Sequence, residues 1–302
     1  MTGSTTLVVC GYASIDYAMQ LAPFQGHDAT TTVRSRADEW PRYGGVAHVT
    51  RAAATASTGS VRVAALSWIG ADAEGVNWER AVKDGGATTE GVATVGTRSP
   101  SAHLLYPEGE GTICLFDPGD AHSGGLTTAQ RELLQRAACA VVTIGPEAAT
   151  RELLSVLPAG ARLFWIVKQD PASLPDSLAA ELARRSRIIT LSEGERGYLD
   201  TIAAVAAPGT GVIVTRGVEG AELLWLGTDR VLSRVGVVPA QPVAGVDTTG
   251  AGDTFSGTLA ALIAGDEDLD AERMLTHIQH AAAATAAMLT ERVVSTPATP
   301  TN

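Results

Sequence analysis

The 302-residue sequence is poor in lysine and has no long apolar run. Its only two lysines, Lys83 and Lys168, each follow a valine, so the Gly-Lys-Ser/Thr of a P-loop is missing from the sequence. A membrane span needs roughly 18 consecutive apolar residues, and no such run is present. The first residues lack the basic region of a signal peptide and lead into an apolar segment that predicts a buried strand, Leu7–Cys10.

Cysteine and basic charge are also scarce. The three cysteines, Cys10, Cys114 and Cys139, have an odd count and no Cys-x-x-Cys spacing, which argues against a disulfide framework or a structural zinc. We interpret them as core thiols of a cytoplasmic protein. The six histidines form no metal-ligand motif. A net charge of −11 argues against nucleic acid or an anionic membrane as the main partner.

From about residue 60 onward, short β-like runs alternate with alanine-rich helical stretches. This alternation predicts a single α/β domain over residues 1–302, with a mostly parallel sheet and helices on both faces. The expected strands are Val61–Ala65, Ala140–Ile144, Leu163–Val167, Ile188–Leu191 and Gly211–Thr215. The expected helices are Thr127–Ala138, Leu174–Arg185 and Ala271–Leu289. Segments 17–40 and 98–118 depart from the alternation with β-like pieces, Thr30–Val33 and Ala102–Tyr106, which as ordinary structure would be surface hairpins.

The segment Asp247-Thr-Thr-Gly-Ala-Gly-Asp-Thr-Phe255 joins a loop to a helix. Apolar residues recur after it at helical spacing and Gly265 is a typical stop, so the helix is expected to begin near Gly252. Unpaired N–H groups at such a terminus favour a phosphoryl group or a developing anion. Asp253 would repel that anion, which makes sense for a base that takes the proton of an attacking hydroxyl. The alternative is a carboxylate that only stabilises the helix start.

The whole string resembles the C-terminal signature of the ribokinase-like (PfkB) carbohydrate kinase family, which also contains nucleoside kinases. The resemblance implies a three-layer α/β/α sandwich that uses ATP. It implies Asp253 as catalytic base and the backbone of Gly250, Ala251 and Gly252 as the anion hole for the γ-phosphate. It also implies that segments 17–40 and 98–118 pair into a small β-sheet lid over the acceptor, which would join two subunits in a homodimer.

The acceptor residues that the resemblance implies lie in the N-terminal part. Asp16 follows the first strand at the family's spacing and would accept two sugar hydroxyls, whereas its residue type alone indicates a turn. Gly44 and Gly45 resemble a pair that lets the backbone approach the sugar. His48 is the polar residue nearest to the family's Asn, in a segment one residue shorter, and a capping or packing role is its alternative. Phe116 matches a lid segment of the adenosine-kinase-like branch, where an aromatic ring can stack on a base.

The nucleotide residues that the resemblance implies lie in the C-terminal part. The turn positions along ATP are Thr215, Gly217 and Gly220, with a plain hairpin into Ala221–Leu226 as the alternative. Ser192 and Glu195 match an Asn-x-x-Glu motif, with Ser in place of Asn, and Glu195 is expected to act on magnesium indirectly. His280 matches an Asn near the adenine, and a polar residue on a packing face is its alternative.

Two further features bear on phosphate and cations. Asp247 and Thr249 match positions near a monovalent-cation site in some relatives, although the later cation-loop pattern is poor around residues 291–294. Lys168 is a further candidate for a phosphate contact.

The leading interpretation is an ATP- and Mg²⁺-dependent kinase that phosphorylates a hydroxymethyl group of a sugar. A nucleoside is the alternative acceptor. A third interpretation is a sensor of nucleotides or metabolites without turnover, motivated by the replacements at His48, Ser192 and His280. Asp253 opposes it, because a pure binder has little use for a base directed at a phosphate.

Overall fold

A nine-stranded sheet runs through the molecule in the computed structural model, which describes residues 5–57, 59, 61–109, 111–243, 247–266 and 269–295. Its parallel strands are β1 (Thr5–Cys10), β5 (Val61–Ile69), β6 (Thr88–Thr94), β9 (Cys139–Val142), β10 (Arg162–Ile166), β11 (Ile188–Ser192) and β12 (Gly211–Thr215). Two antiparallel strands, β13 (Ala221–Leu226) and β14 (Leu232–Val238), complete one edge. The spatial order is β14-β13-β12-β11-β10-β9-β1-β5-β6.

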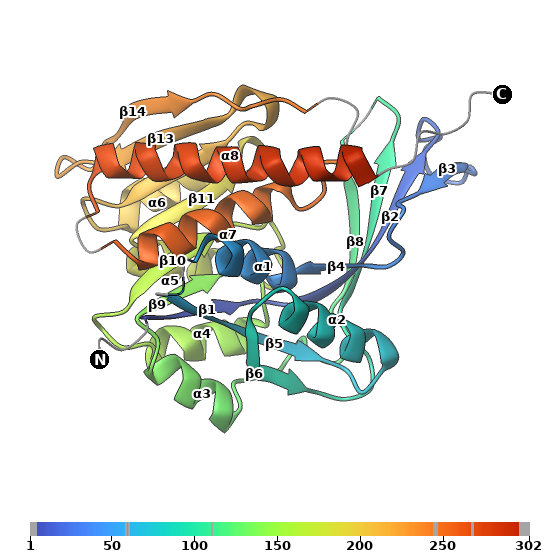
Figure 1. The fold of residues 1–302 in the computed structure, drawn as a ribbon, viewed down its shortest axis with the longest axis horizontal. Coiled ribbons are helices and arrows are strands. Elements are labelled where there is room, and N and C mark those ends of the chain that lie inside the picture. Colours follow the sequence, from blue (N-terminus) through green and yellow to red (C-terminus); the bar gives the residue numbers. More distant parts are fainter. Residues whose placement is uncertain are drawn as a thin grey trace.

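Helices cover both faces of this sheet (Figure 1). Side chains of a strand alternate between faces, so Leu7 and Val9 of β1 enter one core while Val8 and Cys10 enter the other. The first core is closed by α1 (Val46–Ala56), α2 (Ala73–Asp84), α7 (Ala251–Ala264) and α8 (Ala271–Ser295). The second is closed by α3 (Thr128–Gln135), α4 (Glu147–Val156), α5 (Asp176–Arg185) and α6 (Leu199–Val205). The predicted α/β/α sandwich is confirmed. Within the described ranges, no helix is both long and apolar enough to cross a membrane.

The helix ends differ from the predicted ones where a capping residue intervenes. Thr127 stands outside α3 as its N-cap: its hydroxyl accepts a hydrogen bond from the Gln130 N–H at 3.3 Å, and the Gln130 side chain accepts one from the Thr127 N–H at 2.9 Å. Pro175 has an extended conformation before α5, so that helix begins at Asp176. These caps shorten both helices relative to the apolar pattern.

A second sheet of five strands stands at one end of the molecule (Figure 1). It contains β2 (Ala13–Leu21), β3 (Val33–Arg36), β4 (Arg42–Gly45), β7 (Ser101–Pro107) and β8 (Ile113–Asp117). The predicted small sheet is therefore confirmed, although β3 begins at Val33 and residues 30–32 lie outside it. Cys114 is exposed on the edge strand β8, so its interpretation as a core thiol is wrong, while Cys10 and Cys139 are buried as expected.

In the small sheet, neighbouring residues across the strands form rows. Successive side chains of a strand point to opposite faces, so consecutive rows lie on opposite faces of the sheet. One row, directed toward the main body, consists of Asp16, Ala102 and Phe116. The next row, directed outward, consists of Tyr17, His103 and Leu115. In the outward row the two rings stack with centroids 5.1 Å apart, and Leu115 is 56% exposed. On this opposite face His103 and Leu115 are exposed, whereas Tyr17 is partly buried and packs against the first core.

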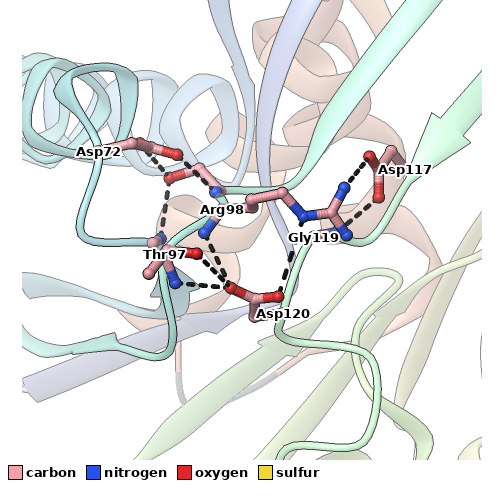
Figure 2. Close-up of polar contacts among 8 residues, drawn as sticks. Asp72, Thr97, Arg98, Asp117, Gly119 and Asp120 are labelled. Atoms are coloured by element: carbon pink, nitrogen blue, oxygen red, sulfur yellow. Dashed lines mark hydrogen bonds and ion pairs between the residues drawn. The ribbon is translucent and has the colours of Figure 1, made fainter.

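Polar contacts tie the base of the β7–β8 hairpin to the main body (Figure 2). The Asp120 carboxylate accepts a hydrogen bond from the Arg98 N–H at 2.9 Å, and the Arg98 guanidinium pairs with Asp117 at 3.0 Å. Asp72, the N-cap of α2, accepts a hydrogen bond from the Ser99 N–H at 2.7 Å. These contacts thus fix both chain ends of the hairpin at its base.

Candidate active site

Helix α7 begins where the chain leaves the loop 247–250. Gly250 is its N-cap with a φ of 78°, in the left-handed region that favours glycine, and a Cβ there would stand 3.1 Å from Cδ2 of His48. The helix begins at Ala251, one residue before the predicted start. Its first N–H groups have no acceptor within the helix. No described atom lies within 4 Å of a Cβ built on Gly252, so there is open space over the helix terminus.

Asp253, in the first turn of α7, forms an ion pair with Lys168. The Lys168 ammonium lies 3.1 Å from Oδ1 of Asp253, whose side chain is 15% exposed. Burial alone would raise the pKa of Asp253, but the Lys168 charge outweighs it and the net shift is downward. His48 acts in the same direction only when it is protonated. The carboxylate of Asp253 is therefore ionised at neutral pH.

Asp16 is the fourth residue of β2 and not part of a turn after β1, so the turn interpretation is wrong. Its side chain is buried and accepts a short hydrogen bond from the Ser14 hydroxyl. A Cβ on Gly44 would overlap this carboxylate, so glycine is required there for Asp16 to fit. The pKa of Asp16 is raised to about 6, foremost by burial and also by the Asp253 charge, while the Ser14 hydrogen bond and the Arg42 charge lower it. The two carboxylates are thus electrostatically coupled.

His48 lies in the first turn of α1, beside Gly250. The helix starts after Gly45, which has a φ of 59° and whose Cβ would stand 2.7 Å from the Tyr12 carbonyl oxygen. Nε2 of His48 is buried and has no hydrogen-bond partner among the described residues. Burial lowers the pKa of His48 to about 4 against the opposing effect of Asp253, so the ring is neutral at pH 7. The structure brings this predicted acceptor residue next to the predicted anion hole.

Phe116 contacts the main body through an aromatic pair. Its ring centroid lies 5.0 Å from that of Tyr12, with the planes tilted by 54°. The Tyr12 hydroxyl lies 3.3 Å from the Ser173 hydroxyl. Because Phe116 belongs to the same inward row as Asp16, an aromatic surface and a carboxylate share one face of the small sheet.

Two of the residues predicted to bind the nucleotide, Ser192 and Thr215, lie at the carboxyl ends of β11 and β12, where they are register partners. Oε2 of Glu195 accepts hydrogen bonds from the Ser192 N–H at 2.7 Å and from its hydroxyl at 2.8 Å. The pKa of Lys168 is raised, chiefly by the Asp253 charge and further by the Glu195 charge. The Lys168 ammonium is therefore coupled electrostatically to both Asp253 and Glu195. No group of three or more His, Cys, Asp or Glu residues gathers as a metal cluster in the described part of the chain.

The turn after β12 requires glycine at two positions. Gly217 and Gly220 have φ angles of 55° and 98°, and a Cβ on Gly220 would overlap the Val238 carbonyl oxygen. His280 is exposed on α8, two residues after the buried Ile278, so its contact with a nucleotide stays a prediction.

The small sheet contacts the loop that precedes α7, which sequence reasoning did not find. Arg42 of β4 forms an ion pair with Asp247 at 2.8 Å, and Asp247 also accepts a hydrogen bond from the Thr249 N–H at 2.8 Å. The Tyr106 hydroxyl of β7 lies 2.9 Å from the Thr249 hydroxyl. These partners, like Lys168 and Asp253, are distant in sequence, and no local pattern links them.

A cavity of about 1200 Å³ adjoins this region. Residues of the small sheet, α1, α7 and α8 line it, among them His48, Asp247 and Thr254. Asp16 and Asp253 are not among its lining residues, so the cavity lies beside the carboxylate pair and does not enclose it.

Three solved structures illustrate the similarity of the fold. A ribokinase from Cryptococcus neoformans var. grubii serotype A in complex with ADP has a TM-score of 0.75 and 18% identity, covering 95% of this chain and 94% of that one. An Arabidopsis thaliana ribokinase complexed with ribose and ATP gives 0.70 and 19%, covering 96% and 93%. A Burkholderia thailandensis nucleoside kinase in complex with inosine gives 0.68 and 20%, covering 95% and 90%. At these identities the likeness establishes the fold.

The family follows from a different comparison. A search of curated protein sequences finds no match to this chain. The model of the pfkB family of carbohydrate kinases, however, matches residues 4–302. With Asp253 at the start of α7 and the glycines on either side of Ala251, the chain belongs to the pfkB family and is an ATP-dependent phosphotransferase.

Proposed function

We propose that this kinase transfers the γ-phosphate of ATP to a hydroxymethyl group of a sugar. The observation that carries the proposal is Asp253, an ionised carboxylate at a helix N-terminus, paired with Lys168 at 3.1 Å and coupled electrostatically to Asp16. A helix terminus stabilises a phosphoryl group, so the backbone from Gly250 to Gly252 is the proposed anion hole. A base beside it needs a proton donor, which is the acceptor hydroxyl.

The two carboxylates take different roles because their surroundings differ. Asp16, buried beside Gly44, accepts hydrogen bonds from acceptor hydroxyls, and Gly45 next to it lets the backbone approach the acceptor. Asp253 receives the proton of the attacking hydroxyl as the phosphoryl group transfers. His48 contributes a neutral ring next to Gly250, and its unpartnered Nε2 supports a hydrogen bond to acceptor or phosphate.

ATP and magnesium complete the proposed reaction. The adenine and phosphates would lie along Thr215, Gly217, Gly220, Ser192 and His280. Glu195 fits an indirect magnesium role, because both of its Ser192 hydrogen bonds go to Oε2 and magnesium keeps several waters with few carboxylates. When bound with ATP, magnesium neutralises charge on the β- and γ-phosphates.

The decisive experiment measures ADP release with Mg-ATP across a panel of sugars and nucleosides. The proposal expects a sugar with a free hydroxymethyl group to give the highest kcat/KM, and expects Asp253→Asn to lower that release by at least about a hundredfold. Turnover of nucleosides alone would contradict the sugar assignment. ATP binding without transfer to any acceptor would contradict the kinase assignment for this site.

A nucleoside acceptor is the second candidate, and Phe116 favours it. The ring lies against Tyr12 on the same sheet face as Asp16, where it could stack on a base. Phe116→Ala would then raise the KM for a nucleoside by about tenfold or more, the loss of one base stack, while leaving the KM for a sugar nearly unchanged. The same KM change for both acceptors would contradict base stacking.

We further propose that the small sheet is a lid and that its outer face joins two subunits. Exposed apolar side chains support this: Leu115 is 56% exposed, Val33 46% and Trp40 36%, all on this sheet or at its margin. Mass measurement in solution should give a dimer, and Leu115→Glu should give a monomer with its catalytic residues intact. Hydrogen exchange in segments 17–40 and 98–118 should slow when acceptor binds. A wild-type monomer, or unchanged exchange, would contradict the respective claim.

A further inference from the structure

Two carbonyl oxygens of the loop before α7 converge on one side chain. Nη1 of Arg292, near the end of α8, donates hydrogen bonds to the carbonyl oxygen of Asp247 at 2.9 Å and to that of Thr249 at 2.7 Å. Thr249 is followed directly by Gly250, the N-cap of α7. A single nitrogen of the C-terminal helix therefore holds the backbone that leads into the proposed anion hole.

The charge at this position is permanent. Burial lowers the pKa of Arg292, as do the Arg42 and Arg51 charges, while Asp247 and Glu39 raise it. A guanidinium nevertheless stays protonated in proteins, because its ordinary pKa lies far above neutral pH. Arg292 thus presents a fixed positive charge to two oxygens that carry partial negative charge.

A second guanidinium, that of Arg42, holds the side chain of the same loop. Arg42 contacts the Asp247 carboxylate at 2.8 Å, whereas Arg292 contacts the backbone of Asp247 and Thr249. The Asp247 carboxylate also accepts the Thr249 N–H at 2.8 Å. Side chain and backbone of the loop are therefore fixed by two cations of the protein itself, one from the small sheet and one from α8.

This arrangement does not fit a monovalent cation at Asp247 and Thr249. In potassium channels, backbone carbonyl oxygens bind the ion by replacing its hydration shell. The two oxygens that would serve here already accept hydrogen bonds from Arg292, and an added cation next to the guanidinium would be repelled. We propose that Arg292 is a built-in cation that positions the loop, so that this kinase works without potassium or sodium. The part of this inference that concerns turnover rests on the proposed function.

The first test compares the wild-type protein in potassium, sodium and tetramethylammonium chloride at equal ionic strength. The readouts are the affinity for a non-hydrolysable ATP analogue measured by calorimetry, the melting temperature, and the turnover of whichever acceptor the panel identifies. We expect affinity and turnover to agree within about twofold across the salts, since a ligand without a site shifts no equilibrium. Tenfold or stronger activation by potassium or sodium would overturn the proposal.

The second test removes the guanidinium. Arg292→Ala should weaken binding of the analogue or lower turnover by at least about tenfold, the lower end for losing charged hydrogen bonds. Millimolar guanidinium or potassium chloride should restore part of the loss, which a merely structural defect would not show. Arg273→Ala is the matched control, an arginine of the same helix whose side chain is 52% exposed and pairs with Asp266. It should behave as wild type in every salt.

The outcomes separate this inference from the proposed function. If no acceptor turns over, the proposed function fails, yet analogue affinity across the salts still decides the role of Arg292. An Arg292→Ala variant with unchanged affinity and turnover, or with a loss that no cation restores, would overturn the proposal. If that variant does not fold, the wild-type comparison across salts decides between the two outcomes by itself.

Discussion

Replacing Asp16 by asparagine is expected to stabilise the folded protein while weakening acceptor binding. The pKa of Asp16 is raised from 3.8 to about 6, foremost by burial. A raised pKa means that the folded state holds its proton more tightly than the unfolded state. The stability contributed by this proton is complete below about pH 3.8 and is lost as pH rises through about 6. At neutral pH the ionised Asp16 therefore destabilises the fold.

The magnitude follows from the same two values. The difference between 3.8 and about 6 corresponds to about 3 kcal/mol against the ionised form. Asparagine can still accept the Ser14 hydrogen bond through its carbonyl oxygen, but it gives up the attraction to Arg42. We expect a net gain of about 1–3 kcal/mol in the free energy of unfolding at pH 8 and almost none at pH 4. The same change should raise the acceptor KM by about tenfold or more, since charge-assisted hydrogen bonds are lost.

Urea denaturation monitored by tryptophan fluorescence, from pH 4 to pH 8, measures the gain. Asp38→Asn is the control, because it removes an exposed carboxylate near the small sheet and should change stability by less than about 0.5 kcal/mol. A gain that does not grow between pH 4 and pH 8, or a less stable Asp16→Asn protein at pH 8, would refute the burial argument.

Four further predictions concern the start of α7 and the lysine that pairs with it. Asp253→Asn should lower kcat by at least about a hundredfold in steady-state kinetics with ATP affinity preserved, the low end for losing a positioned base; near-wild-type kcat would contradict this role. Lys168→Met should move the acidic limb of the pH–rate profile to higher pH, because the ammonium holds the pKa of Asp253 down; an unmoved limb would mean that another group sets it. Gly250→Ala should cost about 1–2 kcal/mol of stability in thermal unfolding, since its φ is 78°. Gly252→Ala should leave stability unchanged or higher yet lower kcat, because its Cβ enters the space proposed for the phosphoryl group; equal kcat would place the phosphate elsewhere.

Sequence patterns predicted the fold because its elements are local. The buried strands, such as Gly211–Thr215, were predicted from apolar runs, and β12 has the same bounds. The start of α7 was predicted within one residue, because its glycines and apolar spacing lie in one short string. The start of α3 was predicted one residue too early, because Thr127 caps the helix and does not belong to it.

The electrostatics of the candidate site could not be predicted in this way. Nothing in the residues around Lys168 indicates that its ammonium meets Asp253, and nothing around Arg292 indicates the carbonyl oxygens of Asp247 and Thr249. Such pairs depend on how distant elements pack. The strand position of Asp16 was missed for a related reason, since β2 is stabilised by partners that the sequence brings in much later, on β7.

The polar contacts at the base of the β7–β8 hairpin mark the position at which this hairpin could be replaced by another. The hairpin carries Phe116 on the inward row, and its two ends meet at Asp120, Arg98 and Asp117 (Figure 2). A hairpin from another kinase grafted between these ends would replace Phe116, while Asp16 would keep its Ser14 hydrogen bond and Asp253 its Lys168 partner, none of which belongs to the hairpin. In this sense the aromatic part of the proposed acceptor site can diversify while the two carboxylates are retained.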